Sequence, residues 1–243
     1  MDGRQVVGLG DRILSEYGSE WDVGWPLALS ADGTVVACRL SKRKGCVSVN
    51  GRRGPEFDWT GSPVLSRDGR RLAYRAQEGD RSFVVIDGRQ GPEFEFMSDP
   101  AISADGSVVA YAASRGGRWF LVAGDRETPV DHQPSFVFLS EDGRSVGTWH
   151  IERGPDGGSR IRVLAGGTPG EAFSLVGRPS FSPDGSRVAY AADDGDRKYI
   201  VIDGRKVEVS GRAGDPVFSP DGKKVGYGAR VGREIWWKVL EVR

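Results

Sequence analysis

The chain has 243 residues, 38% of them hydrophobic, which is enough for a packed core and too many for an intrinsically disordered chain. Its 34 Lys and Arg residues balance 34 Asp and Glu residues, a balance that favours neither nucleic acid nor an anionic membrane as a partner. The 36 glycines and 13 prolines favour many short elements joined by turns over long helices.

The cysteine content and the hydropathy pattern exclude several other classes of protein. Cys38 and Cys46 are the only cysteines, too few for a disulfide framework or a four-ligand zinc site. No stretch reaches the roughly 18 consecutive apolar residues that a membrane helix needs, and the first residues lack the pattern of a signal peptide. We therefore expect a soluble monomer, cytoplasmic for the chain as it stands, and periplasmic or secreted if a leader has been removed.

One five-residue phrase recurs six times along the chain: an apolar residue, Ser, a variable residue, Asp and Gly. Its aspartates are Asp32, Asp68, Asp105, Asp142, Asp184 and Asp221. Successive aspartates are separated by 36, 37, 37, 42 and 37 residues. A fixed period in this range is typical of a solenoid, a propeller or an array of repeats.

Each repeat has the pattern of four strands. In the second repeat they are expected at 63–66, 71–74, 83–86 and around 94–96, with the Asp-Gly phrase forming a tight hairpin between the first two. No window of ten or more residues has the 3.6-residue apolar rhythm of a helix. The sequence therefore predicts an all-β fold, a β-propeller with four antiparallel strands per blade.

The six repeats predict a single domain over residues 1–243, a six-bladed propeller whose last blade is completed by an N-terminal strand. The sixth repeat ends with its third strand at 234–240, which leaves a sheet edge open to unwanted pairing. Gly18–Asp22 matches the phrase Gly54–Asp58, so residues near 18–24 are expected to fill that edge. The expected blades are 26–61, 62–99, 100–133, 134–177, 178–215, and 216–243 together with 17–25; residues 1–16 have no place in this scheme.

Two phrases carry a resemblance to a known family. Phe181–Tyr190 resembles the repeat of the TolB-like, WD-type β-propellers, and Val85–Arg89 and Val201–Arg205 are similar to a bacterial branch of that group. The resemblance covers nearly the whole chain and implies a six-bladed fold. Such propellers serve as interaction platforms, as domains of peptidases and as proteins of unknown role, so the resemblance implies no particular partner.

Two features invite a catalytic or metal-binding interpretation. Gly143–Gly147 matches the G-x-S-x-G pattern around Ser145, but that motif needs a turn from a strand into a helix, and here it falls between two strands of a blade. His132 and His150 are the only histidines. Because residues of different repeats can meet across a ring, a metal site remains an alternative. We expect no enzyme, with no catalytic residue, cofactor or metal ligand.

The repeats differ most in two sets of loops that share one face of a WD-type propeller. These are the tips between the second and third strands, which mix basic and acidic residues, and the connections into the next blade. Charged runs usually keep a surface soluble, whereas aromatic residues and arginine anchor binding patches. For Trp25 and Trp59, wedging between blades is the alternative. The candidate binding face consists of Trp25, Lys42, Arg43, Lys44, Trp59, Arg81, Asp99, Arg118, His132, Arg153, Arg178, Arg197 and Asp215.

The tip of the fourth blade, Glu152–Ser159, is the longest, and long loops on a rigid scaffold often carry function, although tolerated drift explains the length equally well. We expect a non-catalytic scaffold that binds a protein or peptide through one face, with neither nucleic acid nor membrane as a partner. One alternative is a lyase or hydrolase that acts on a sugar or peptide at the channel mouth. Another is a propeller domain of a larger enzyme.

Overall fold

A computed structural model describes residues 5–9, 12–154 and 157–242. Within these ranges the regular elements are all β-strands, arranged as six sheets of four or five strands and one two-stranded hairpin. The chain divides into two compact units, Met1–Asp131 and His132–Arg243. The described residues include no helix of the length and apolarity that crossing a bilayer requires.

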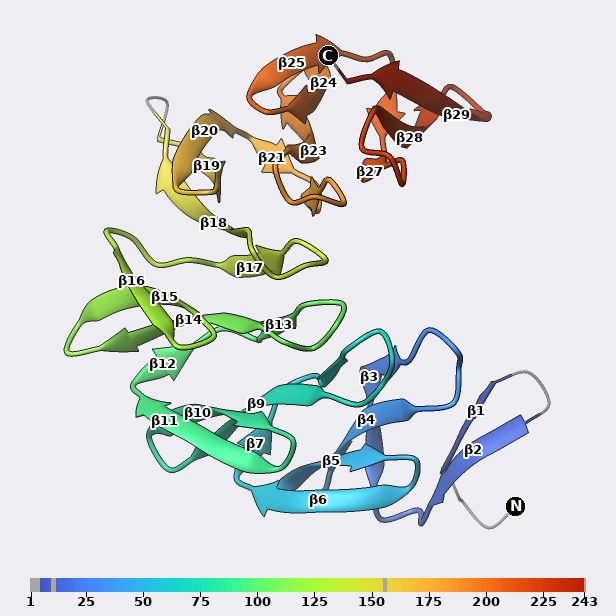
Figure 1. The fold of residues 1–243 in the computed structure, drawn as a ribbon, viewed down its shortest axis with the longest axis vertical. Helices are drawn as coiled ribbons and strands as arrows, with labels where there is room; N and C mark the ends of the chain where they lie inside the picture. Colours follow the sequence, from blue (N-terminus) through green and yellow to red (C-terminus); the bar gives the residue numbers. More distant parts are fainter. Residues whose placement is uncertain (1–4, 10–11, 155–156, 243) are drawn as a thin grey trace. The chain divides into compact units, whose positions relative to one another are not determined.

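The first unit contains the hairpin and three sheets, which follow one another in chain order (Figure 1). The hairpin pairs β1 (Gln5–Leu9) with β2 (Arg12–Tyr17). The first sheet consists of β3 (Asp22–Leu29), β4 (Val36–Ser41), β5 (Gly45–Val49) and β6 (Arg52–Phe57). The second consists of β7 (Trp59–Thr60), β8 (Val64–Leu65), β9 (Leu72–Glu78), β10 (Arg81–Ile86) and β11 (Arg89–Phe94). The third consists of β12 (Phe96–Met97), β13 (Ala101–Ile102), β14 (Val109–Arg115), β15 (Arg118–Ala123) and β16 (Arg126–Val130).

The second unit contains three more sheets with the same antiparallel order. The fourth sheet consists of β17 (Phe136–Leu139), β18 (Val146–Arg153), β19 (Ser159–Ala165) and β20 (Thr168–Phe173). The fifth consists of β21 (Leu175–Val176), β22 (Ser180–Phe181), β23 (Val188–Asp194), β24 (Arg197–Ile202) and β25 (Arg205–Glu208). The sixth consists of β26 (Arg212–Ala213), β27 (Val217–Phe218), β28 (Lys224–Val231) and β29 (Glu234–Glu241).

Three of the four pairs of successive sheets within the units pack through an aromatic residue at the end of the fourth strand, and between the fifth and sixth sheets Val209 takes this place. The aromatic residue is buried against an aromatic side chain of the next sheet, in the edge-to-face arrangement that aromatic rings prefer. The pairs and the distances between their ring centroids are Phe57–Phe83 (5.3 Å), Phe94–Tyr111 (5.9 Å) and Phe173–Tyr190 (6.2 Å). The segment that ends the first, second and fourth repeats, with its aromatic residue, therefore joins one sheet to the next.

Each Ser-x-Asp-Gly phrase forms a tight turn between the first and second strands of a sheet. In the fifth repeat the buried Ser182 hydroxyl donates to Asp184 Oδ1 (2.5 Å) and accepts the backbone N–H of Arg187 (3.0 Å). The same carboxylate oxygen accepts the N–H of Ser186 (3.1 Å). Gly185 has a φ of 68°, in the left-handed region that favours glycine. The same Ser–Asp hydrogen bond occurs in the other five copies, at Ser30–Asp32, Ser66–Asp68, Ser103–Asp105, Ser140–Asp142 and Ser219–Asp221.

These turns make the stability of the protein depend on pH in a defined direction. Hydrogen bonds from Ser182 and Ser186 lower the pKa of Asp184 from 3.8 to about 2. The folded protein therefore favours the ionised carboxylate. The resulting contribution to the free energy of unfolding is complete above about pH 4 and is lost as the pH falls to about 2. We expect Asp184→Asn to lower the melting temperature at neutral pH and to have little effect near pH 2.

Thermal unfolding followed by circular dichroism across this pH range measures the effect. Ser182→Ala removes the main donor to the same carboxylate, so it is expected to reproduce the pH dependence. If the difference in melting temperature between the wild-type protein and Asp184→Asn stays constant as the pH falls, the carboxylate of Asp184 does not stabilise the turn in the way proposed.

Strand pairing corrects the expectation for the N-terminal segment. The sequence predicts that residues 17–25 complete the last blade, but Asp22–Gly24 begin β3 and pair with β4 of the first sheet, where Val23 lies opposite Leu40. The corresponding residues Trp59 and Thr60 likewise pair with the sheet that follows them. The physical reason is that the chain crosses to the next sheet directly after the buried aromatic, so the residues beyond it belong to that next sheet. Closure of six blades into one ring remains a prediction.

The hairpin of β1 and β2 covers the outer face of the first sheet. Val7, Tyr17 and Trp21 form a buried cluster with residues of β4 and β5, and the Tyr17 hydroxyl donates to Ser48 Oγ (3.0 Å). The hairpin thus gives the first sheet the apolar cover that each later sheet in a unit receives from the sheet before it.

The tip between β18 and β19 is shorter than the sequence suggests, because both strands extend into Glu152–Ser159. The N–H of Gly154 donates to the carbonyl of Gly158 (2.8 Å), and the N–H of Gly157 donates to the carbonyl of Gly154 (3.0 Å). Pro155 and Asp156 lie outside the described residues. A functional role for this loop remains a prediction.

The two cysteines are predicted to be unreactive in the folded protein. Cys38 is 1% exposed and Cys46 is fully buried, and burial raises the pKa of both thiols. We expect neither to react with iodoacetamide under native conditions and both to react in guanidinium chloride, as measured by mass spectrometry. Alkylation of the native protein at a rate above that of global unfolding would indicate that the first sheet opens locally.

Candidate binding face

The hairpin tips and the connections between sheets lie together at one end of the sheets. Asp58, directly after β6, accepts the backbone N–H of Gly79 at the tip of the next sheet (2.9 Å). Glu95, directly after β11, accepts the N–H of Gly116 in the same way (2.9 Å). We call this end, with its tips and connections, the connection face. The six Ser-x-Asp-Gly turns lie at the other end of the second strands, and we call that end the turn face.

Arg75 forms the centre of an aromatic cluster on the connection face. Its side chain extends from β9, and its Cζ atom lies 5.1 Å from the ring centroid of Trp59 and 5.0 Å from that of Phe96. Phe96 also packs edge-to-face against Trp119, with 5.5 Å between the ring centroids. Trp59 and Phe96 are 39% and 40% exposed. The guanidinium is therefore held by two cation–π contacts at rings that solvent or a partner can reach.

A carboxylate, Asp99, and a second arginine, Arg39, belong to the same cluster. Asp99 lies in the connection after β12, and the absence of a side chain at Gly61 makes room for it, because a Cβ there would lie 2.6 Å from Asp99 Oδ1. Asp99 is an exposed residue, but partial desolvation of its carboxyl group raises its pKa, and the positive charges of Arg75 and Arg39 oppose this shift. Desolvation also lowers the pKa of Arg75, opposed by the charge of Asp99. The positive charges of two guanidinium groups thus act on one carboxylate, which leaves an excess of positive charge.

The hydrogen-bonding capacity of the cluster is incompletely used. Arg75 Nε is buried and has no hydrogen-bond partner among the described residues. A buried donor without an acceptor costs about 1–3 kcal/mol, and more when the group is charged. An acceptor supplied by a ligand would recover part of that cost.

The remaining predicted residues of the first unit lie around this cluster or at the tips. Trp25 is 79% exposed and follows Gly24, where an added Cβ would lie 2.7 Å from Arg39 Nε. Lys42, Arg43 and Lys44 form the tip between β4 and β5, where Lys44 pairs with Glu78 (3.2 Å) and Asp58 (3.5 Å) and Lys42 lies over the Trp21 ring (5.8 Å). At the next two tips, Arg81 pairs with Glu93 and Arg118 is exposed.

In the second unit the predicted residues form two groups. The backbone N–H of Arg178 donates to Asp215 Oδ1 (2.9 Å), and its guanidinium lies 5.9 Å from the Phe136 ring centroid. His132 stacks on His150, with ring centroids 3.6 Å apart. Arg153 and Arg197 are exposed at the tips.

Sequence reasoning missed Arg39 and Arg75, and it placed Phe96 in a connection on this face without including it among the candidate binding residues. Arg39 and Arg75 occupy the same position in the second strands of their sheets. The third, fifth and sixth sheets have Ala112, Ala191 and Gly228 there, and the fourth has Trp149. A charged residue at one position of an otherwise small and apolar strand is the signal that could have identified them. Phe96 is the counterpart of Trp59, one repeat later.

The described residues provide no group of three or more His, Cys, Asp or Glu side chains that could hold a metal ion. The two histidines, which the sequence left open as metal ligands, instead stack through their ring faces with an interplanar angle of 32°. His150 Nε2 lies 3.3 Å from Glu152 Oε2, and that carboxylate also receives two hydrogen bonds from Arg162. The histidines therefore belong to a polar network of the fourth sheet.

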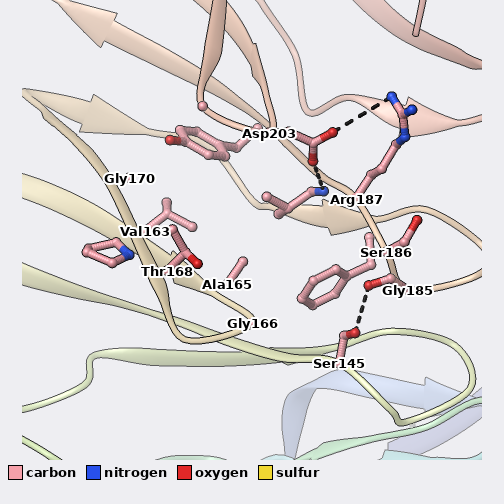
Figure 2. Close-up of a pocket in the computed structure, with 15 residues that line it drawn as sticks. Ser145, Val163, Ala165, Gly166, Thr168, Gly170, Gly185, Ser186, Arg187 and Asp203 are labelled. Atoms are coloured by element: carbon pink, nitrogen blue, oxygen red, sulfur yellow. Dashed lines mark hydrogen bonds and ion pairs between the residues drawn. The ribbon is translucent and has the colours of Figure 1, made fainter. Parts of the chain in front are cut away.

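A cavity of about 430 Å³ lies between the fourth and fifth sheets, and its lining includes Ser145 (Figure 2). The Ser145 hydroxyl donates to the backbone carbonyl of Gly185 (2.7 Å). No histidine is among the described residues that line this cavity. Asp203, on the opposite wall, accepts the N–H of Val188 (2.9 Å) and pairs with Arg187. The carboxylate of Asp203 is therefore paired with Arg187 and with the backbone.

The same cavity recurs between the first and second sheets, with a volume of about 490 Å³. Tyr74 occupies the place of Tyr190, and Gly54 that of Gly170. Burial raises the pKa of both tyrosines to about 12. Most of the lining of the second cavity has a counterpart in the first, so this space follows from the packing of sheets, whereas of the two cavities Ser145 and Asp203 line only the one between the fourth and fifth sheets. The cluster around Arg75 is therefore the stronger candidate for a functional site.

Comparison with known proteins identifies the fold. No protein-family model and no curated protein matches the chain. The chain is similar to the Dos1 propeller, with a TM-score of 0.56 and 11% identity over 97% of this chain and 73% of that one. It is also similar to the β-propeller domain of the Trilobed protease from Pyrococcus furiosus, with a TM-score of 0.54 and 12% identity over 93% of this chain and 83% of that one.

TolB from Acinetobacter baumannii is a further match, with a TM-score of 0.43 and 16% identity over 92% of this chain. The chain spans 61% of the length of that TolB. Taken with the four-stranded antiparallel sheets, the two propeller structures above confirm the β-propeller fold that the repeats predict.

Proposed function

We propose that this β-propeller is a non-catalytic scaffold that binds a protein or a peptide through its connection face. The observation that carries the proposal is the position of Arg75 between the half-exposed rings of Trp59 and Phe96. Arginine, tryptophan and tyrosine are the residue types most enriched at the energetic centres of protein interfaces. Here two of these types meet on one surface.

The sheets hold this cluster in a fixed geometry. Trp59 pairs with Gln77 and Thr60 with Ala76, and the N–H of Gly61 donates to the carbonyl of Arg75 (2.8 Å). The aromatic residue and the arginine are therefore tied to adjacent strands by backbone hydrogen bonds. A site built on strands loses little conformational entropy when a partner binds.

The chemistry of the other candidate groups supports a binding role over catalysis. Ser145 donates its hydroxyl hydrogen to a backbone carbonyl, so no base is positioned to activate it. His150 is held by Glu152, which Arg162 also holds. The tips carry acidic as well as basic residues, and this mixture fits a protein surface better than a nucleic acid.

We expect charge reversal on the connection face to release a partner and charge reversal on the turn face to have no effect. Arg118 and Arg197 are exposed at tips of the first and second unit, so Arg118→Glu with Arg197→Glu changes the connection face in both. Arg70→Glu with Arg144→Glu is the matched control, because these arginines lie in the Ser-x-Asp-Gly turns and their side chains are 86% and 87% exposed.

The measurement is a quantitative affinity capture from lysate of the source cell with three baits: the intact protein and the two double variants. A protein retained by the intact chain and by the turn-face variant, and lost from the connection-face variant, supports the scaffold. Equal retention by all three baits, or no protein above background, contradicts it and favours screening the channel for small ligands and metals.

A further inference from the structure

We propose that the cluster of Arg39, Arg75, Trp59, Phe96 and Asp99 binds a carboxylate side chain of the partner, within an acidic peptide segment whose neighbouring residues are apolar. This inference rests on the proposed function and names the chemistry of the partner that the connection face accepts.

The charges of the cluster favour a single added anion. Arg39 and Arg75 carry two positive charges, and Asp99 supplies one negative charge that interacts with both. A further carboxylate would balance the group. Guanidinium presents its N–H donors in a planar fork that matches the two oxygens of a carboxylate, and such charge-assisted hydrogen bonds are about twice as strong as neutral ones.

The cluster also has an unused donor for this anion. Arg75 Nε is buried without an acceptor among the described residues. The two rings that flank the guanidinium keep it in place without consuming any of its N–H groups, because cation–π attraction acts through the ring face. The arginine is therefore oriented while its hydrogen-bonding capacity stays available.

Apolar neighbours of the carboxylate are inferred from the exposed rings around the cluster. Trp59 and Phe96 present about two fifths of their surfaces, and Trp25, next to the Gly24 that adjoins Arg39, is 79% exposed. Burial of apolar surface contributes about 25 cal/mol per Å². A segment that places apolar side chains on either side of its Asp or Glu would cover these rings as the carboxylate meets the arginines.

The surroundings argue against a polyanion such as a nucleic acid. The tip and the connections next to the cluster carry the carboxylates of Glu78, Asp58 and Glu95, which would repel a run of phosphates. Nucleic-acid affinity comes from several Lys or Arg residues that each neutralise a phosphate along the backbone. Two arginines beside one aspartate suit one localised negative charge.

The repeats themselves indicate that the arginines are dispensable for folding. The equivalent positions hold Ala112 in β14 and Ala191 in β23, in sheets of the same topology. Arg75→Ala and Arg39→Ala therefore give the first and second sheets a residue that the same scaffold already accommodates. Circular dichroism and the melting temperature check that each variant is folded.

The test uses a phage-displayed library of random short peptides, selected on the intact 243-residue protein. We expect the selected peptides to be enriched in Asp and Glu next to apolar residues. Binding of one synthetic selected peptide is then measured by fluorescence anisotropy. Arg75→Ala and Arg39→Ala are each expected to raise Kd by about 30-fold or more, because truncating one partner of a close charge pair costs about 2–5 kcal/mol.

Matched variants separate this contact from a general effect of charge. Arg70→Ala, on the turn face, removes the same charge and is expected to leave Kd unchanged. Arg75→Lys keeps the charge without the planar fork and is expected to give an intermediate Kd. Replacing the acidic residue of the peptide by its amide should weaken binding to the wild-type protein more than binding to Arg75→Ala, because the variant has already lost one of the two arginine contacts of that carboxylate.

Several results would overturn the inference. They are selected peptides without acidic enrichment, Kd values unchanged in both arginine variants, or a single-stranded oligonucleotide that binds the connection face more tightly than the acidic peptide. Each of these leaves the proposed function intact if the connection-face variant with Arg118→Glu and Arg197→Glu still releases a cellular partner. Failure of both the selection and the affinity capture counts against the scaffold itself.

Discussion

The packing of one buried side chain, in most cases aromatic, at the end of a fourth strand against the face of the next sheet holds successive sheets of a unit together. Phe57, Phe94 and Phe173 each end a fourth strand and meet an aromatic ring of the following sheet. A β-sheet has two faces, so a sheet covered in this way can cover the next sheet in turn. Because the chain crosses between sheets directly after this residue, the connections that follow Phe57, Phe94 and Phe173 lie at the same end of the sheets as the hairpin tips.

Comparison of equivalent positions in the six repeats distinguishes residues that the fold requires from residues that are present in only some repeats. The Ser-x-Asp-Gly turns, the buried tyrosines and the cavities between sheets recur with the same contacts, and their origin is the packing of the repeat. Arg39 and Arg75 stand where the third, fifth and sixth sheets have a small residue and the fourth sheet has Trp149. The fold does not require these two arginines, so their presence needs a different explanation, and binding provides one.

The charged groups of the two faces differ in how well their surroundings compensate them. On the turn face, serine and backbone donors lower the pKa of Asp32, Asp105 and Asp184 to about 2, so the ionised form of each carboxylate is stabilised by its own turn. On the connection face, desolvation raises the pKa of Asp99 and lowers that of Arg75, and both shifts disfavour the charged forms. Perturbed ionisable groups of this second kind cluster at functional sites.

The sequence by itself determined the all-β class, the period of the repeat, the strands and turns within each repeat, and the β-propeller fold. These features depend on residues close together in the chain, such as the Asp-Gly of a turn and the β-branched run of a third strand. Only the tertiary structure decided that Arg75 lies between Trp59 and Phe96, that Asp99 fills the space beside Gly61, and that His132 stacks on His150. It also decided that Asp22–Gly24 join the first sheet. These contacts join residues that lie well apart in the chain or follow from where it crosses between sheets, and neither is contained in the pattern of a single repeat.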